Sequence, residues 1–194
     1  SGQALSDSVL VLLGDGWQGM RVTDDGAVIA LQPGVIGAMA NRRLAPLGRK
    51  IGPDPASIDA VAVSHLHWDH AGGFLTRAGK LAFPRARIVA QKDEWAFALG
   101  DNPRLVASYE QEELRLVEAA GRAGAADGPE ELVPGVEVIM TGGHTGGHQA
   151  VVVRGRDRTV GFFGDLCMRP WNGNPRWVPS FDDFPLTSVQ VKAT

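Results

Sequence analysis

The stretch Ser64-His65-Leu66-His67-Trp68-Asp69-His70 holds three imidazoles and a carboxylate within the six residues that end it. Imidazole is the commonest side-chain ligand of metal ions, and carboxylates bind the same ions. The two remaining histidines, His144 and His148, lie in the glycine-rich stretch Thr141-Gly142-Gly143-His144-Thr145-Gly146-Gly147-His148. All five histidines therefore fall in two short clusters, and this pattern predicts a site for a divalent metal.

The first cluster directly follows an apolar run, residues 60–64, that is typical of a strand. Because α/β proteins place their sites in loops at the C-terminal ends of strands, we expect the cluster to lie in such a loop. His65 and His67, two residues apart in an extended segment, would project to the same side. The alternative is a polar loop whose histidines cap the strand or bond the backbone. Four such groups held together without a cation would be costly, so a metal site is favoured.

Strand-length apolar runs and amphipathic stretches alternate along the rest of the chain. The predicted strands are residues 9–13, 27–31, 60–64, 87–90, 136–140, 149–153 and 159–163. The predicted helices are residues 35–47, 92–99 and 103–121, and residues 121–134, rich in alanine, glycine and proline, are expected to form a connector. Strands with consecutive β-branched residues are usually covered on both faces. We therefore expect an α/β class fold and a single domain spanning residues 1–194.

Composition limits the classes of partner. The chain has 194 residues, of which 44% are hydrophobic, a formal net charge of −3 and no run of basic residues. These values argue against nucleic-acid and anionic-membrane surfaces and favour a small-molecule substrate. The longest apolar run, residues 9–13, is too short to cross a bilayer, and no leader precedes it. The single cysteine, Cys167, excludes an internal disulfide, so we expect a soluble, cytoplasmic protein.

The first cluster resembles a family signature. His65-Leu66-His67-Trp68-Asp69-His70 is similar to the HxHxDH motif of the metallo-β-lactamase superfamily, and Ala71-Gly72-Gly73 extends the likeness to its lactonase-like and glyoxalase-like members. The resemblance covers roughly residues 58–185. It implies an αββα four-layer sandwich with a site for one or two metal ions at the edge where two sheets meet. The expected cofactor is Zn²⁺, with other divalent metals as alternatives.

The second cluster resembles the family's TPGHTPGH segment, with Gly142 and Gly146 in place of the prolines. The resemblance implies that His144 joins His65 and His67 as a ligand of the first metal, and that His148 is structural. Proline at Gly142 and Gly146 is expected to stiffen the loop and tighten metal retention.

An aspartate later in the chain completes the implied ligand set. Gly164-Asp165 resembles the family's GD motif, whose aspartate bridges two metals. Asp69, His70 and Asp165 would then hold the second ion, whereas Cys167 is expected to be a packing residue rather than a ligand.

The superfamily's two-metal site uses one more histidine, located well after the bridging aspartate. This chain has no histidine after His148, and 29 residues follow Asp165. Three explanations remain open: a chain truncated or rearranged at the C-terminus, water or substrate in the ligand's place, or a single-metal site. Truncation is favoured, because residues 181–194 approach a helix beginning at Pro185 and stop before the family's final strand. The family's early Asp-Thr-Gly is also replaced, by Gln32-Pro33-Gly34.

The resemblance implies a metal-dependent hydrolase that acts on an ester, lactone or thioester through a metal-bound hydroxide. Asp69 is the expected catalytic residue, because a carboxylate there could take and return the proton. The segments around His70 and His144 look closest to the homoserine-lactone-hydrolysing branch. However, the tyrosine common in that branch after the bridging aspartate is replaced by Leu166, Cys167 and Met168.

Three other functions are kept as alternatives. The first is a non-catalytic or impaired domain that binds one metal. The second is a β-lactam or organophosphate hydrolase of the same superfamily. The third, ranked last, is a nuclease, because no basic track is visible in the sequence.

Aromatic residues near the C-terminus raise the question of a substrate pocket. Residues 169–185 contain Trp171, Trp177, Phe181 and Phe184 among prolines and glycines. They could form an apolar wall that favours an acyl chain, or they could cover the core of the sandwich. Trp68, inside the signature, is a candidate for the pocket floor.

Overall fold

The computed structural model describes most of the chain from Ile58 onward. The described residues are 18–21, 28–31, 56, 58–76, 78–103, 107–155 and 157–194, the first two ranges as strand backbone only. Three sequence predictions lie outside these residues: the strand at 9–13, the helix at 35–47 and the replaced motif Gln32-Pro33-Gly34.

The first sheet is mixed and has five strands in the order β1-β2-β3-β4-β5. They are β1 (Gln18–Arg21), β2 (Val28–Leu31), β3 (Ala60–Ala62), β4 (Arg87–Gln91) and β5 (Ala123–Ala126). β1 pairs antiparallel with β2, and the other neighbours are parallel. Parallel strands are buried on both faces, which explains the uninterrupted apolar sequence of β3 and of residues 88–90 in β4.

The second sheet is antiparallel and has the order β6-β7-β8-β9. Its strands are β6 (Glu130–Val133), β7 (Val136–Met140), β8 (Gln149–Arg154) and β9 (Thr159–Phe162). The strands predicted at 27–31, 60–64, 87–90, 136–140, 149–153 and 159–163 are therefore confirmed within two residues at either end.

The expectation that residues 121–134 form a connector is wrong, because β5 and β6 lie within them. β5 pairs with β4 along its whole length, from Ile88↔Ala123 to Gln91↔Ala126. Its small residues suit this place: the Trp95 indole donates a hydrogen bond to the Gly124 carbonyl, and a Cβ at Gly124 would lie 2.7 Å from the Arg87 side chain. A strand defined by pairing with a distant partner leaves little signal in its own composition.

Four α-helices are described: α2 (Trp68–Ala71), α3 (Lys92–Ala98), α4 (Gln111–Ala119) and α5 (Pro185–Lys192). The helix predicted at 92–99 and the helix start at Pro185 are confirmed. The helix predicted at 103–121 is found as α4 from Gln111, and among the described residues before it Tyr109 is buried, with its hydroxyl donating a hydrogen bond to Glu94. Tying Tyr109 into the core turns the chain before α4 can start.

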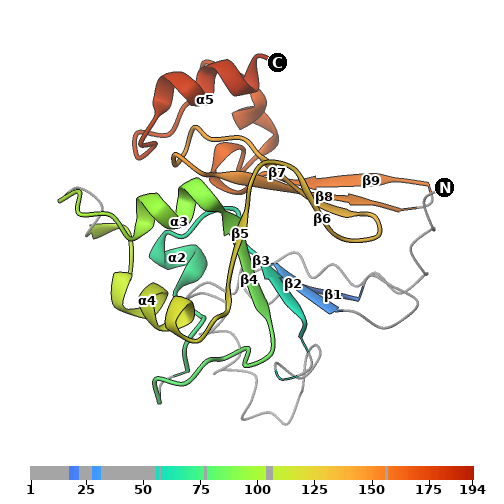
Figure 1. The fold of residues 1–194 in the computed structure, drawn as a ribbon. Helices are drawn as coiled ribbons and strands as arrows, with labels where there is room; N and C mark the ends of the chain where they lie inside the picture. Colours follow the sequence, from blue (N-terminus) through green and yellow to red (C-terminus); the bar gives the residue numbers. More distant parts are fainter. Residues whose placement is uncertain are drawn as a thin grey trace, which may run out of the picture.

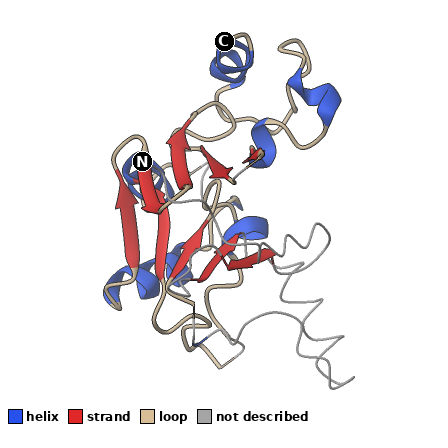
Figure 2. Cartoon of the chain, turned by 90° about the vertical axis from the view of Figure 1, so that its right-hand side faces the viewer, coloured by secondary structure: helices blue, strands red, loops and turns tan. Residues whose placement is uncertain are grey.

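Two apolar layers hold the fold together. Helices α2, α3 and α4 cover one face of the first sheet, where Val61 and Ile88 pack with Trp95, Leu114 and Val117. The opposite face meets the second sheet, and the contact between them is made of Ala62, Val89, Ala126, Val136, Val138, Val151 and Val153. α5 lies beyond the second sheet (Figure 1), so the layers are helices, sheet, sheet and helix. Figure 2 shows the strands from the side.

Polar bonds join the two sheets at one edge. The Gln149 side chain donates to the Val63 and Val89 carbonyls and accepts from Gln91, and the Gln149 N–H donates to the Ser64 carbonyl at 2.8 Å. These bonds fix the start of β8 against the end of β3. The loops that precede β8 and follow β3 contain the two histidine clusters, so they are brought together. None of the helices in the described part of the chain has the length and apolar character that a membrane span requires.

Candidate metal centre

The first histidine cluster lies in the loop after β3, as expected from the sequence. His65 is fully buried in extended chain, and α2 begins directly after His67. The N–H groups of His70 and Ala71 donate to the His67 carbonyl at 2.9 and 2.8 Å, which starts the helical turn. Asp69 and His70 therefore sit on α2, turned relative to His65 and His67.

The second cluster forms the loop between β7 and β8. The N–H groups of Thr141 and Gly142 both donate to the His148 carbonyl, which closes the loop and buries His144. Gly142 has a φ of +67°. Proline is locked near −65°, so the expectation that proline at Gly142 would tighten the loop is wrong. Proline there would break the loop that presents His144.

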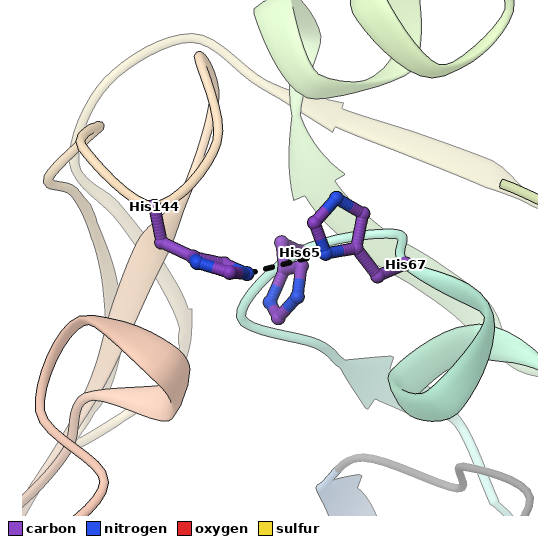
Figure 3. Close-up of side chains that lie close together, drawn as sticks. All are labelled: His65, His67 and His144. Atoms are coloured by element: carbon purple, nitrogen blue, oxygen red, sulfur yellow. Dashed lines mark hydrogen bonds between the residues drawn. The ribbon is translucent and has the colours of Figure 1, made fainter. Parts of the chain in front are cut away.

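Three imidazoles from the two loops converge (Figure 3). The ring centroids of His65, His67 and His144 are 4.5 to 4.9 Å apart, and one ligand atom from each ring lies within 4.8 Å of the others. His144 Nε2 is 3.1 Å from His67 Nδ1. His65 Nε2 is buried and has no hydrogen-bond partner among the described residues. Buried polar atoms without partners are rare, and such a donor set fits a metal ion.

Burial keeps the imidazoles of His65 and His67 neutral, which is the form that binds metal. Burial, followed by the neighbouring imidazoles His70 and His148, lowers the pKa of His65 well below its ordinary value. Burial and the nearby His144 lower the pKa of His67 to about 4. Both rings therefore offer lone pairs rather than positive charge at neutral pH.

His65, His70 and Asp165 form a second group of three ligand atoms within the same distance limit. Asp165 comes from the short 3₁₀-helix Gly164–Leu166 (η4), directly after β9. His70 Nε2 lies 3.2 Å from Asp165 Oδ1 and 3.4 Å from Asp69 Oδ2. Burial opposes charge on His70, but its bonds to Asp165 and Asp69 outweigh burial and raise its pKa to about 9. His70 must lose this proton before it can bind a metal ion, since only the neutral imidazole is a ligand.

Asp69 and Asp165 stay ionised at neutral pH. Burial opposes their charge, but the bonds to His70 prevail and lower the pKa of both carboxyls. Asp69 is the more exposed, with 44% of its side chain accessible against 15% for Asp165. Of the two, Asp69 is thus the carboxylate that meets solvent.

The remaining candidates lie beside the two groups. His148 is buried, its Nδ1 is 2.6 Å from the Thr141 hydroxyl, and burial and His144 lower its pKa to about 3. His148 belongs to neither ligand group. Cys167 also lies outside both groups, and its thiol is 3.4 Å from the Arg169 carbonyl.

The aromatic residues of segment 169–185 do not cover the core. Trp171, Trp177, Phe181 and Phe184 are 40% to 59% exposed, and Trp68 is 46% exposed. The Phe181 ring lies 5.7 Å from the His144 ring, and Phe184 lies 5.7 Å from Phe97. The alternative that these aromatic residues cover the core of the sandwich is therefore wrong. Phe181 places an apolar surface beside the histidines.

Two buried carboxylates at the site were missed by the sequence analysis. Glu94 of α3 accepts hydrogen bonds from both histidine loops, at Leu66 and at Thr145 and Gly147. Asp182 lies 2.9 Å from His144 Nδ1. Neither stands in a histidine motif. The sequence shows only that both residues are acidic, and acidic residues are rarely buried without partners.

Comparison with known proteins agrees with this architecture. The sequence model of the metallo-beta-lactamase superfamily matches residues 34–179. An N-acyl homoserine lactonase AiiB from Agrobacterium fabrum is 33% identical over 137 residues, which cover 66% of this chain and 47% of that protein. An N-acyl homoserine lactonase from Bacillus cereus is 30% identical over 112 residues, covering 57% of this chain and 39% of that protein. The chain thus spans less than half the length of these relatives.

Solved structures share the fold. A probable metal-dependent hydrolase from Staphylococcus aureus superposes with a TM-score of 0.72 at 24% identity, covering 89% of this chain and 66% of that one. The dizinc quorum-quenching lactonase AidC superposes with a TM-score of 0.71 at 19% identity, covering 89% and 64%. With the family match over most of its length and the αββα layers around two converging histidine loops, this chain belongs to the metallo-β-lactamase superfamily.

Proposed function

We propose that this chain is a metal-dependent hydrolase that opens lactones. The observation that carries the proposal is the convergence of three buried imidazoles, His65, His67 and His144, next to a second group that includes His70 and Asp165. The choice of lactone is supported by relatives at about 30% identity that are N-acyl homoserine lactonases. The same site chemistry suits other esters and thioesters, which the experiment below includes.

In this proposal His65, His67 and His144 hold one Zn²⁺ ion. Asp69, His70 and Asp165 hold a second ion, and the ligand atoms of His70 and Asp165 lie close together. When bound, zinc lowers the pKa of a water molecule to about 7 and polarises the substrate carbonyl.

Asp69 is the proton carrier in this proposal. Its carboxylate is ionised at neutral pH and reaches solvent, so it can accept a proton from the attacking water. It then returns the proton to the alkoxide that leaves when the ring opens.

Phe181 supports an apolar substrate. Its ring is 53% exposed and lies 5.7 Å from the ring of His144. Burying such a ring against an acyl chain removes apolar surface from water, which favours binding. A lactone with an acyl side chain would meet this surface while its ring carbonyl faces the histidines.

A single-metal, non-catalytic domain is the second candidate, and one observation favours it. The protonated His70 already satisfies Asp69 and Asp165, so this group is electrostatically balanced without a second cation. If the protonated His70 is more stable between these carboxylates than a second metal ion, the chain binds one metal at His65, His67 and His144.

Metal stoichiometry combined with a substrate panel separates the two candidates. The purified chain is loaded with zinc, its metal content is measured, and hydrolysis of N-acyl homoserine lactones, an unsubstituted lactone, a thioester, a β-lactam and a phosphotriester is followed by proton release. We expect lactone opening that a chelator abolishes and zinc restores. In Asp69→Asn, kcat should fall about 100-fold or more and the zinc content should fall towards one ion per chain, because Asp69 is both the proton carrier and a ligand of the second ion. One bound metal with no turnover of any substrate would replace the enzyme proposal with the single-metal domain.

A further inference from the structure

The segment 181–188, before and within α5, is fastened to the loop that presents His144. The Asp183 N–H donates to the His144 carbonyl at 2.9 Å, and the Phe184 N–H donates to the Gly143 carbonyl at 3.0 Å. The Asp182 carboxylate lies 2.9 Å from His144 Nδ1. Three consecutive residues therefore bind the backbone and the side chain of one short stretch of the loop.

Gly143 shows how closely α5 approaches this loop. Its φ is +92°, which L side chains rarely adopt, and a Cβ there would lie 2.7 Å from Ser188 Oγ and 3.0 Å from Ser188 Cα. Only glycine fits such an approach. The position of the His144 backbone is thus set by contact with α5.

The Asp182 side chain is fully buried, and both of its oxygens accept hydrogen bonds. The Ser188 hydroxyl donates to Oδ2 at 2.5 Å, and Oδ1 faces His144 Nδ1. Carboxylate oxygens accept hydrogen bonds, so we place the proton of the second bond on Nδ1. A neutral imidazole with its proton on Nδ1 has its lone pair on Nε2.

His144 Nε2 is the atom that faces the other histidines, 3.1 Å from His67 Nδ1. In the other tautomer, Nε2 would carry a proton pointing into the group, and it could not bind a metal. The choice of tautomer therefore decides whether His144 is a ligand.

We propose that Asp182, held by Ser188, is the positioning residue that fixes His144 in its metal-binding tautomer. The proposal rests on the assignment of His144 as a ligand in the proposed function. Hydrogen bonds from a carboxylate to a ligand histidine fix the tautomer and orient the ring, and losing such a partner commonly weakens metal affinity about 10- to 100-fold.

Two substitutions at this position predict different results. In Asp182→Asn, the amide oxygen can accept from His144 Nδ1 while its NH₂ donates to the Ser188 hydroxyl, so the tautomer is kept and the charge is lost. Asp182→Ala removes the acceptor altogether. Relative to the unchanged chain, we expect zinc affinity to fall about 10-fold in Asp182→Asn and about 100-fold in Asp182→Ala.

Zinc affinity is measured by competition with a chromophoric chelator, and the His144 tautomer by ¹⁵N NMR of the imidazole nitrogens in the metal-free protein. The unchanged chain and Asp182→Asn should show the proton on Nδ1, and Asp182→Ala should show a mixture of tautomers. Glu113→Gln is the matched control: this partly buried carboxylate accepts a hydrogen bond from the Leu75 N–H and touches neither ligand group. Its zinc affinity and His144 tautomer should remain unchanged.

The outcomes separate this proposal from the proposed function. Zinc affinity and tautomer unchanged in a folded Asp182→Ala would overturn the positioning role, even if the enzyme hydrolyses lactones. A chain that binds no zinc would overturn the ligand assignment itself. If Asp182→Ala fails to fold, Asp182→Asn and Ser188→Ala test the proposal instead. Full zinc affinity in both of these variants would contradict it. So would a proton on Nε2 of His144 in the unchanged chain.

Discussion

Replacing Glu94 with glutamine should loosen both histidine loops at once. Glu94 Oε1 accepts the N–H of Leu66, between His65 and His67, and the hydroxyl of Tyr109. Oε2 accepts the Thr145 hydroxyl at 2.6 Å and the Gly147 N–H at 3.2 Å, on either side of Gly146. A single buried carboxylate on α3 thus ties the loop after β3 to the loop before β8.

Glutamine keeps the shape of this side chain but turns one oxygen into an NH₂ group. Each carboxylate oxygen accepts one backbone N–H and one hydroxyl. The hydroxyl can rotate and accept from the NH₂, whereas the backbone N–H cannot. In either orientation one buried N–H therefore loses its partner, and the longer bond, from Gly147, is the one expected to be lost.

The magnitude follows from two opposing effects. A buried donor left without a partner costs about 1–3 kcal/mol. Against this, burial raises the pKa of Glu94, so its charged form lowers stability as the pH rises through the folded pKa, and glutamine removes that cost. We expect a net loss of about 1 kcal/mol at neutral pH, at the lower end of the range for one unpaired buried donor, because the relieved cost of the buried charge offsets part of it.

Urea unfolding of the metal-free protein measures this loss, with Glu113→Gln as the control for neutralising a partly buried carboxylate. A double-mutant cycle of Glu94→Gln with Thr145→Val tests the shared bond, and the two effects should not add. If Glu94→Gln unfolds at the same urea concentration as the unchanged chain, the carboxylate does not hold the loops together and the reasoning fails.

Three further predictions follow from the same geometry. Gly147→Ala should destabilise the fold by about 3 kcal/mol or more, since its Cβ would lie 2.2 Å from the Glu94 backbone nitrogen, whereas Gly173→Ala, with open space around it, should leave the melting temperature unchanged. The metal-free protein should lose stability as the pH falls from 6.5 towards 3, because burial lowers the pKa of His148 to about 3 and the unfolded state therefore binds the proton first. His148→Gln should reduce the slope of the unfolding free energy against pH by about 1.4 kcal/mol per pH unit. Zinc at 100 times its Kd should raise the free energy of unfolding by about 2.7 kcal/mol, and a chelator should reverse the gain; no change in melting temperature with zinc would contradict the ligand assignment.

The strands and the histidine loops were accessible to sequence reasoning because their signals are local. The apolar run at residues 60–63, which includes β3, and the histidines that follow it lie within a few residues, so their spacing carries the information. β5 was missed because its sequence, Ala123 to Ala126, is extended only through pairing with β4. The start of α4 was placed too early because Tyr109 is drawn to Glu94, a contact across 15 positions of the chain.

The residues of the site also divide into those that a local motif predicts and those that only long-range contacts reveal. His65, His67, Asp69 and His70 could be named from one motif, since neighbours in sequence must be neighbours in space. Asp182 and Glu94 could not, because an acidic residue in an ordinary stretch is usually solvated and nothing local shows that it is buried. Their partners, at 2.6 to 3.2 Å, come from distant parts of the chain.

The sequence alone determined the family resemblance, the two histidine clusters and their metal chemistry, because ligand types and spacing are properties of short segments. The tertiary structure brings His144 to His65 and His67, as the resemblance implied, and it alone places Asp182 against His144 and Glu94 between the two loops. These features depend on long-range packing, in which the Gln149 bonds align two sheets and bury the carboxylates. A buried charged side chain must find particular hydrogen-bond partners, and it becomes buried only once the layers have packed together.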